Sequence, residues 1–163
     1  MRWQLLAIGR LKSGPERDLV DRYCTRVDSL GRASGFGALD ISEIPEARAR
    51  SAPERALAEG AMLQSRAGGT KLVAFDERAP SLSSPDFAER LRTWRDAGSS
   101  ISFVIGGPDG LDAALRIRAD LVVSFGQLTL PHQIVRVLVV EQIYRALTIL
   151  AGHPYHRGEP GES

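Results

Sequence analysis

Four chemically capable side chains stand together near the end of this chain. The segment "HPYHR" places His153, Tyr155, His156 and Arg157 within five residues, directly after Gly152. Histidine titrates near neutral pH and can accept a proton, while arginine can hold a phosphate or a developing oxyanion. The cluster therefore favours acid–base and anion-binding chemistry. The alternative is a capped tail whose aromatic side chain docks on the protein surface.

A metal site is a weaker interpretation of the same residues. His132, His153 and His156 are the three histidines of the chain, but no cysteine or carboxylate is spaced to complete a ligand set with them. The single cysteine, Cys24, has no partner for a disulfide or redox pair. We therefore expect no metal and a reducing, cytoplasmic environment.

Two glycine-containing loops follow predicted strands. In "IGGPDG", Gly106 and Gly107 allow the backbone to approach a ligand closely, although the spacing matches neither the dinucleotide nor the phosphate-loop pattern. In "GQLTLPH", the backbone from Gly126 to Pro131 lies between the apolar side chains of Leu128 and Leu130, which suits an adenine ring. Taken alone, the first loop also fits a tight turn and the second a plain connector.

The elements that position these loops alternate between strand and helix. Because such alternation indicates a parallel sheet covered on both faces, we expect a three-layer α/β sandwich with a mostly parallel sheet of five to six strands. Ligands of such sheets collect beyond the carboxyl ends of the strands, where both loops fall, as does "FDERAPS". Ser84 is the expected N-cap of the third helix, Gly31 the end of the first and Gly152 the end of the last. Strands are predicted over 2–9, 36–44, 70–76, 100–107 and 121–126, and helices over 15–30, 51–67, 83–98, 109–120 and 131–150.

Length and charge limit the classes of function. The 163 residues fit one domain, predicted over 1–157 with a disordered tail over 158–163. With a net charge of only +1, the chain does not have the strong positive field expected of a protein that binds nucleic acid on its own. An RNA substrate would therefore need a local basic patch or a groove between two subunits. The apolar run 134–151 is interrupted by charged residues, which excludes a membrane span and favours a buried or dimer-interface helix.

Three C-terminal motifs carry a resemblance to a known family. "VIGGPDGL", "LTLPHQIVRVLVVEQIYRA" and "HPYHR" resemble the ribosomal RNA large subunit methyltransferase H family, small members of the SPOUT class of methyltransferases. The similarity extends over essentially the whole chain, and the three motifs together are highly specific. The resemblance implies an α/β sandwich whose C-terminal segment forms a trefoil knot, against the general rule that chains are un-knotted.

The resemblance also implies an activity and a site. It implies a homodimer that binds S-adenosyl-L-methionine, builds each site from two subunits and methylates N3 of a pseudouridine in helix 69 of 23S rRNA on assembled 70S ribosomes. The Tyr155-His156-Arg157 end matches the family's catalytic tail, and His132 and Arg136 are the candidate substrate contacts. Carried over by motif position, the cofactor contacts fall on Phe75, Gly107, Gly126, Gln127, Leu128, Thr129, Leu130 and Pro131.

The chemistry implied by this cofactor needs no metal and no covalent intermediate. What remains is positioning of the substrate and removal of the imide proton at N3. We hypothesise that His156, alone or with Tyr155, assists deprotonation, while Arg157 and Arg136 stabilise negative charge or hold phosphate.

Two other classes of function stay open at this point. A phosphoester hydrolase using the terminal cluster would need a phosphate loop or a carboxylate-rich metal cluster, which the sequence lacks. A non-catalytic ribosome-binding dimer would account for the apolar last helix but not for the paired glycines and the His-Tyr-Arg cluster together.

Overall fold

Five strands alternate with five helices in the computed structural model, which describes residues 1–157. The order of elements agrees with the order predicted from the sequence. The elements are β1 (Trp3–Ile8), α1 (Pro15–Ala33), β2 (Leu39–Ile44), α2 (Ala52–Ala67), β3 (Lys71–Phe75), α3 (Ser84–Asp96), β4 (Ile101–Ile105), α4 (Ala113–Arg118), β5 (Leu121–Val123) and α5 (His132–Ala151).

The strands form one parallel sheet in the order β2-β1-β4-β3-β5. The predicted α/β class is therefore confirmed, with five strands in the described chain. Because all strands are parallel, every loop that follows a strand leaves from the same edge, called here the C-terminal edge. The threading of the C-terminal segment into a knot stays a prediction, and the tail 158–163 lies outside the described residues.

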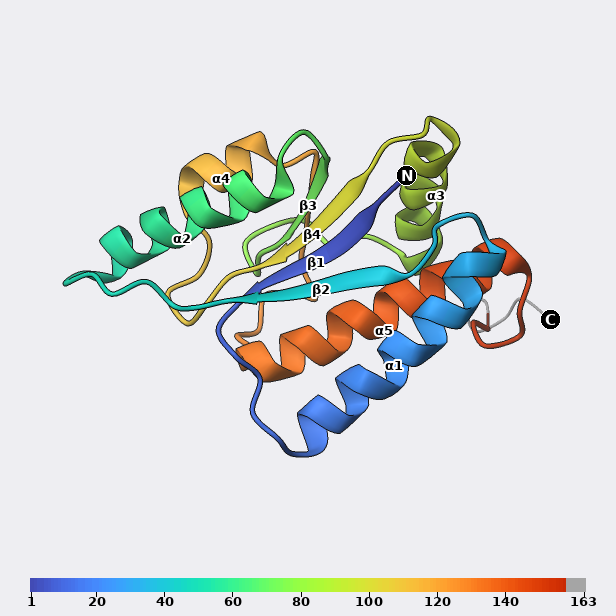
Figure 1. Ribbon diagram of the computed structural model, residues 1–163, viewed down its shortest axis with the longest axis horizontal. Helices are drawn as coiled ribbons and strands as arrows, with labels where there is room; N and C mark the ends of the chain where they lie inside the picture. Colours follow the sequence, from blue (N-terminus) through green and yellow to red (C-terminus); the bar gives the residue numbers. More distant parts are fainter. Residues whose placement is uncertain (158–163) are drawn as a thin grey trace.

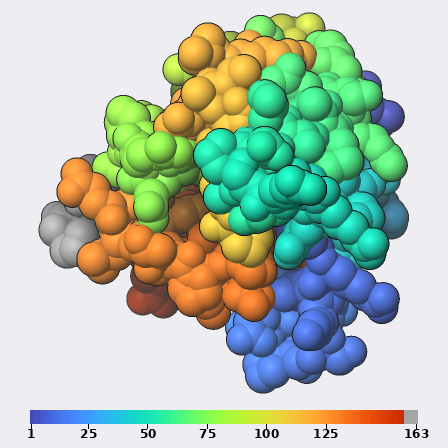
Figure 2. All heavy atoms as spheres, turned by 90° about the vertical axis from the view of Figure 1, so that its left-hand side faces the viewer, coloured from blue at the N-terminus to red at the C-terminus, as the bar shows by residue number. Residues whose placement is uncertain are grey.

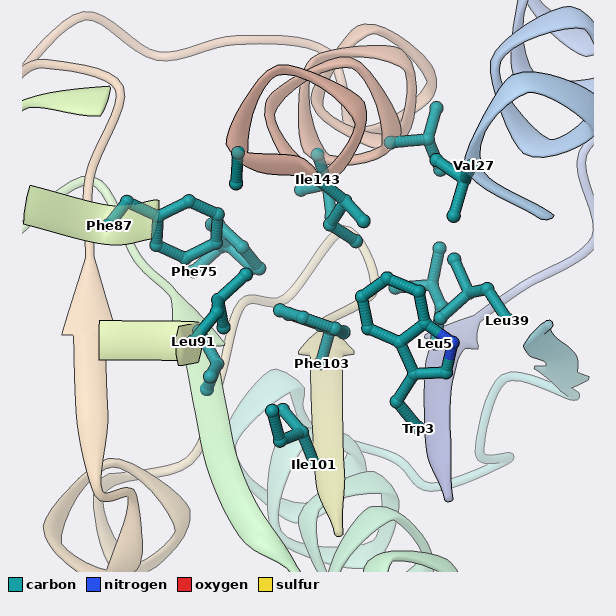
Figure 3. Close-up of a cluster of buried hydrophobic side chains, with 14 of the residues drawn as sticks. Trp3, Leu5, Val27, Leu39, Phe75, Phe87, Leu91, Ile101, Phe103 and Ile143 are labelled. Carbon is teal, nitrogen blue, oxygen red and sulfur yellow. The ribbon is translucent and has the colours of Figure 1, made fainter. Parts of the chain in front are cut away.

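Helices cover both faces of the sheet, as Figure 1 shows, with α1, α3 and α5 on one side and α2 and α4 on the other. The larger core lies beneath α1, α3 and α5. Figure 3 shows Phe103 of β4 at its centre, below Ile143 of α5. Its ring centroid lies 6.2 Å from that of Trp3 and 6.4 Å from that of Phe87, so strands and helices meet through aromatic contacts.

Two helix ends differ from the sequence prediction. Gly31 does not end α1, which continues to Ala33. It is buried inside the helix, and the position requires glycine because a side chain there would overlap the carbonyl oxygen of Gly37. Ser84 is not the N-cap of α3, since the Oγ of Ser83 accepts the hydrogen bond from Asp86 N–H at 3.1 Å. The expected end of α5 is confirmed, with Gly152 in the left-handed conformation at φ 68°.

A buried charge pair fastens the first loop of the C-terminal edge to α5. Arg136 is 3% exposed, pairs with Glu43 at the end of β2, and donates from Nη2 to the carbonyl oxygen of Gly9 at 2.9 Å. The other Glu43 oxygen accepts from Arg17 at 2.8 Å. The backbone N–H of Leu11 also donates to Glu43, so one carboxylate holds the β1–α1 loop, β2 and α5 together.

The pKa of Glu43 reports on this arrangement. Burial raises the pKa, but the hydrogen bonds from Leu11 N–H, Arg17 and Arg136 outweigh burial and lower it from 4.5 to about 2. A carboxyl whose pKa is lower in the folded state stabilises that state above its unfolded pKa, and the stabilisation is lost as pH falls through the folded value. The contribution of Glu43 is therefore lost between about pH 4.5 and about pH 2.

We predict that Glu43→Gln lowers the free energy of unfolding at pH 7 by about 2–4 kcal/mol, because it leaves the buried Arg136 without a counter-charge. Urea unfolding at pH 7 and pH 3 measures the effect, and the difference in free energy of unfolding between the variant and the wild type should be smaller at pH 3. The control is Glu89→Gln, which removes an exposed carboxylate paired with Arg92 and should change little. Equal losses in both variants would contradict this account.

Candidate functional site

A cavity of about 590 Å³ opens at the C-terminal edge, between the loops that follow β3, β4 and β5. Figure 2 faces this edge and shows the recess between light-green, yellow and orange segments, residues 76–82, 105–111 and 125–135. These are the three loops that the sequence singled out. The candidate residues that line the cavity are Phe75, Gly107, Gly126, Leu128, Thr129, Leu130, Pro131 and His132.

Aromatic rings form one wall of the cavity. Phe75 is buried at the end of β3, and its ring stacks on that of Phe125 with centroids 5.5 Å apart and an interplanar angle of 4°. Phe125 was not among the residues predicted from the sequence, although its place just after β5 was a usable signal. Gln127, in contrast, does not line the cavity and is exposed.

The position of Gly107 requires glycine, because Ile8 and Glu59 pack closely against it behind the cavity. A β-carbon there would lie 2.9 Å from Cγ2 of Ile8 and 3.2 Å from Oε2 of Glu59, so a side chain would push the loop out of place. Gly110 N–H donates to the Gly107 carbonyl oxygen at 3.0 Å, and Gly110 has φ 79°. The loop is therefore both a tight turn and a wall of the cavity.

Charged side chains ring the mouth of the cavity. Asp76, whose side chain is 5% exposed, pairs with Arg78 at 3.2 Å and with Arg116 at 3.5 Å. Burial raises the pKa of Asp76, but hydrogen bonds from Arg78 outweigh it and the net pKa is lowered. Across the mouth, Asp109 pairs with Arg55 at 2.8 Å. Asp76 and Asp109 are therefore ionised near neutral pH and already have partners, whereas Glu77, also at the cavity wall, is exposed and makes no ion pair within residues 1–157.

The two proposed substrate contacts have different surroundings. His132 begins α5 at the cavity wall and is partly exposed. Arg136, one turn further along, is buried and its guanidinium is occupied by Glu43 and Gly9. This geometry favours a structural role for Arg136 over contact with a substrate phosphate.

The terminal cluster folds back onto the middle of α5. The hydroxyl of Tyr155 donates to Glu141 Oε1 at 3.0 Å and lies 3.3 Å from the hydroxyl of Tyr23. Arg145 donates to the same Glu141 oxygen, and its Nη1 lies 3.2 Å from Nδ1 of His156. Tyr155 and His156 are therefore held in place, whereas Arg157 is exposed.

The pKa of Tyr155 is raised by burial first, and then by its hydrogen bonds with Tyr23 and Glu141. The phenol therefore stays protonated at neutral pH, which argues against Tyr155 as a proton acceptor. Tyr23 lies 132 positions away in sequence, so sequence analysis had no signal for this contact.

Within one subunit, the cavity and the terminal cluster are not brought together. Glu141 and Arg145, which hold Tyr155 and His156, lie nine and thirteen residues beyond His132 in α5, which is roughly 14 and 20 Å along the helix at 1.5 Å per residue. The cavity lies at the first end of α5, and none of Tyr155, His156 and Arg157 lines it. A second subunit is one way for both groups to reach a common substrate.

Residues 1–157 contain neither a metal-binding group of side chains nor a membrane-spanning helix. No three His, Cys, Asp or Glu side chains of these residues group closely enough to hold a metal ion. None of the helices described here has the length and apolar character needed to cross a membrane.

Comparison with solved structures supports the fold. A probable methyltransferase from Bordetella pertussis has a TM-score of 0.53 at 20% identity and covers 90% of this chain and 94% of that protein. A tRNA (m1G37) methyltransferase from Aquifex aeolicus has a TM-score of 0.51 at 13% identity, with 99% and 77% covered. At these identities the likeness concerns the fold alone.

Sequence comparison goes further. The family described as "Predicted SPOUT methyltransferase" matches residues 1–156. The Ribosomal RNA large subunit methyltransferase H of Methylobacterium radiotolerans is 57% identical, covering 99% of this chain and 100% of its own length. The protein of the same name from Nitrobacter hamburgensis is 54% identical, with 97% and 100% covered. Together with the fold and the cavity, these matches show that the chain belongs to the ribosomal RNA large subunit methyltransferase H family of SPOUT methyltransferases.

Proposed function

We propose that this protein transfers the methyl group of S-adenosyl-L-methionine to N3 of a pseudouridine in helix 69 of 23S rRNA, acting in the cytoplasm as a homodimer on assembled 70S ribosomes. The observation that carries the proposal is the cavity built by the three loops of the C-terminal edge, in a chain of this methyltransferase family. The choice of helix 69 and of N3 rests on the resemblance of the three C-terminal motifs.

The cavity fits the cofactor in size and in chemistry. Its volume of about 590 Å³ lies within the range of small-molecule sites. The apolar side chains of Leu128 and Leu130 can pack on an adenine ring, while the backbone of 126–131 offers donors and acceptors to its edge. Phe75 supplies a flat wall, and Gly107 leaves the loop after β4 close to the ligand. Gln127 belongs to this segment without lining the cavity, so we propose no side-chain contact for it.

When bound, the cofactor supplies an electrophilic methyl group, so the protein needs to hold N3 in line with it and to ease loss of the imide proton. Negative charge then develops on the two carbonyl oxygens that flank N3. Hydrogen-bond donors directed at these oxygens lower the barrier. Arg157, exposed at the end of the terminal cluster, is one such donor or a phosphate contact.

His156 has a defined hydrogen-bonding state in this arrangement. A guanidinium only donates, so Nδ1 of His156 accepts from Arg145, and the proton of the neutral ring lies on Nε2. His156 then presents an N–H donor to the substrate, and it can accept the imide proton only after Arg145 releases Nδ1. We therefore propose that its main role is to stabilise the developing oxyanion, while the imide proton passes to solvent water.

The separation of the cavity from the terminal cluster supports a composite site. If two α5 helices pack antiparallel across a two-fold axis, the terminal cluster of one subunit approaches the cavity of the other. The incompletely covered residues of α5 fit such an interface, since Ile134 is 39% exposed and Val137 and Leu138 are only half-buried.

The cavity assignment predicts a selective loss of cofactor binding. Val135→Trp places an indole at the cavity wall and should weaken S-adenosyl-L-methionine binding at least about tenfold in a calorimetric titration. Gln133→Trp, at an exposed position of the same helix outside the cavity, is the control and should bind like wild type. Failure of the wild-type protein to bind, or equal binding by both variants, would overturn the assignment.

The role of His156 predicts different rates for two substitutions. His156→Ala should lower kcat about a hundredfold, whereas His156→Asn should recover about tenfold of that loss, because an amide donates a hydrogen bond but cannot take the imide proton. Single-turnover methylation of ribosomes measures both rates, with cofactor affinity as the folding control. Equal rates in the two variants would instead assign His156 as the base.

The composite site predicts rescue between two defective subunits. Homodimers of Val135→Trp and of His156→Ala should each be nearly inactive. After random exchange of subunits, half of the dimers are mixed and each has one intact site, so about a quarter of wild-type activity should return. A mixture that stays as inactive as its components would show that each site lies within one subunit.

A further inference from the structure

Four basic residues occupy the part of the C-terminal edge that the cavity leaves free. Arg10 and Lys12 belong to the loop after β1, and Arg48 and Arg50 to the loop after β2. All four are exposed, and within residues 1–157 none of them makes an ion pair. We call these four residues the basic row.

The sheet order places the basic row beside the cavity. β1 pairs with β2 on one side and with β4 on the other, so the loop after β1 leaves between the loop after β2 and the Gly107 loop. Neighbouring strands lie about 4.8 Å apart, which puts the ends of β1 and β2, from which these loops leave, within roughly 10 Å of the end of β4 that carries the Gly107 loop. Figure 2 shows the blue segment 10–20 and the teal segment 45–55 on the face that carries the recess.

Buried groups hold the loop after β1 in place. Gly9 N–H donates to the carbonyl oxygen of Ile44 at 2.7 Å, which ties this loop to the end of β2. Arg136 binds the Gly9 carbonyl oxygen at 2.9 Å, and Glu43 accepts the N–H of Leu11. Arg10 therefore projects from backbone that is fixed on both sides.

Two side chains of α2 connect the loop after β2 to the cavity loop. Arg55 donates from Nη1 to the Ala49 carbonyl oxygen at 3.1 Å, and its Nε and Nη2 bind Asp109 beside the cavity at 2.8 and 3.1 Å. Glu59, 2% exposed, accepts the N–H of Ala47 at 3.1 Å. Its other oxygen lies directly behind Gly107. The segment that carries Arg48 and Arg50 is thus anchored to the Gly107 loop, which lines the cavity.

The local charge at this edge is positive although the chain is nearly neutral. Ion pairs with arginine neutralise the carboxylates of Glu43, Asp76 and Asp109. Glu46 is exposed beside Arg48 and offsets one charge of the basic row, and the exposed Glu77 at the cavity wall offsets another. The loops after β1 and β2 therefore keep unpaired arginine and lysine side chains, the groups that bind phosphate.

We infer that the basic row is the phosphate-binding surface for the substrate RNA, which orients the strand that enters the cofactor cavity. The inference rests on the proposed function and adds the surface that recognises the substrate. Arg10, Lys12, Arg48 and Arg50 contact the sugar–phosphate backbone and carry no base specificity. Anchoring through Arg55 and Glu59 keeps these contacts in register with the cavity.

The test is a variant in which Arg10, Lys12, Arg48 and Arg50 are all changed to Gln. The charge-matched control changes four other exposed basic residues to Gln, namely Arg2, Arg22, Arg32 and Arg66. Methylation of 70S ribosomes that lack the modification is measured at several salt concentrations. Calorimetry with S-adenosyl-L-methionine and thermal unfolding show whether each variant is folded.

The basic-row variant should raise KM for ribosomes at least tenfold and flatten the salt dependence of kcat/KM, since fewer counterions are released on binding. Its kcat and cofactor affinity should stay near wild type, and the control variant should behave like wild type. A normal KM, or equal loss in both variants, would overturn the inference while leaving the proposed function standing. If the wild-type protein methylates no ribosome, the proposed function fails, and co-sedimentation of both variants with ribosomes decides the inference separately.

Discussion

Burial of α5 is the constraint on which the C-terminal half of the molecule depends. The helix packs on α1 and α3 above the sheet, and Ile143 and Leu147 are fully buried in the larger core. Its first turn forms a wall of the cavity, and Glu141 near its middle holds the docked tail. One rigid helix therefore fixes both groups and holds the tail away from the cavity wall. The proposed division of the site between two subunits rests on this separation.

Charge pairing explains how a nearly neutral chain presents a local positive surface. The buried pair of Arg136 and Glu43 serves the fold, because it joins α5, β2 and the loop after β1. At the cavity mouth, arginines neutralise Asp76 and Asp109. The remaining exposed cations at the C-terminal edge are thus free to meet phosphate, as the proposed RNA-binding surface requires.

Patterns within short stretches of sequence predicted the features that depend on residues close together in the chain, namely the helices, the strands and the loops between them. The alternation of strands and helices gave the parallel sheet, and the rule that ligands lie beyond the strand ends selected the three cavity loops. Contacts between distant segments could not be predicted in this way. Gly31 looks like a helix end until the fold brings the Gly37 carbonyl oxygen against it. Arg136 looked available for substrate, because its partner Glu43 is 93 positions away.

The central claim is that the loops of the C-terminal edge deliver a methyl group to one position of ribosomal RNA. The most direct measurement incubates the purified protein with S-adenosyl-L-methionine and 70S ribosomes that lack the modification, followed by mass spectrometry of the 23S rRNA fragment that contains helix 69. The account predicts a single added methyl group, located at N3 of a pseudouridine in that fragment. Methylation at another position, or none by a protein that binds the cofactor, would contradict it.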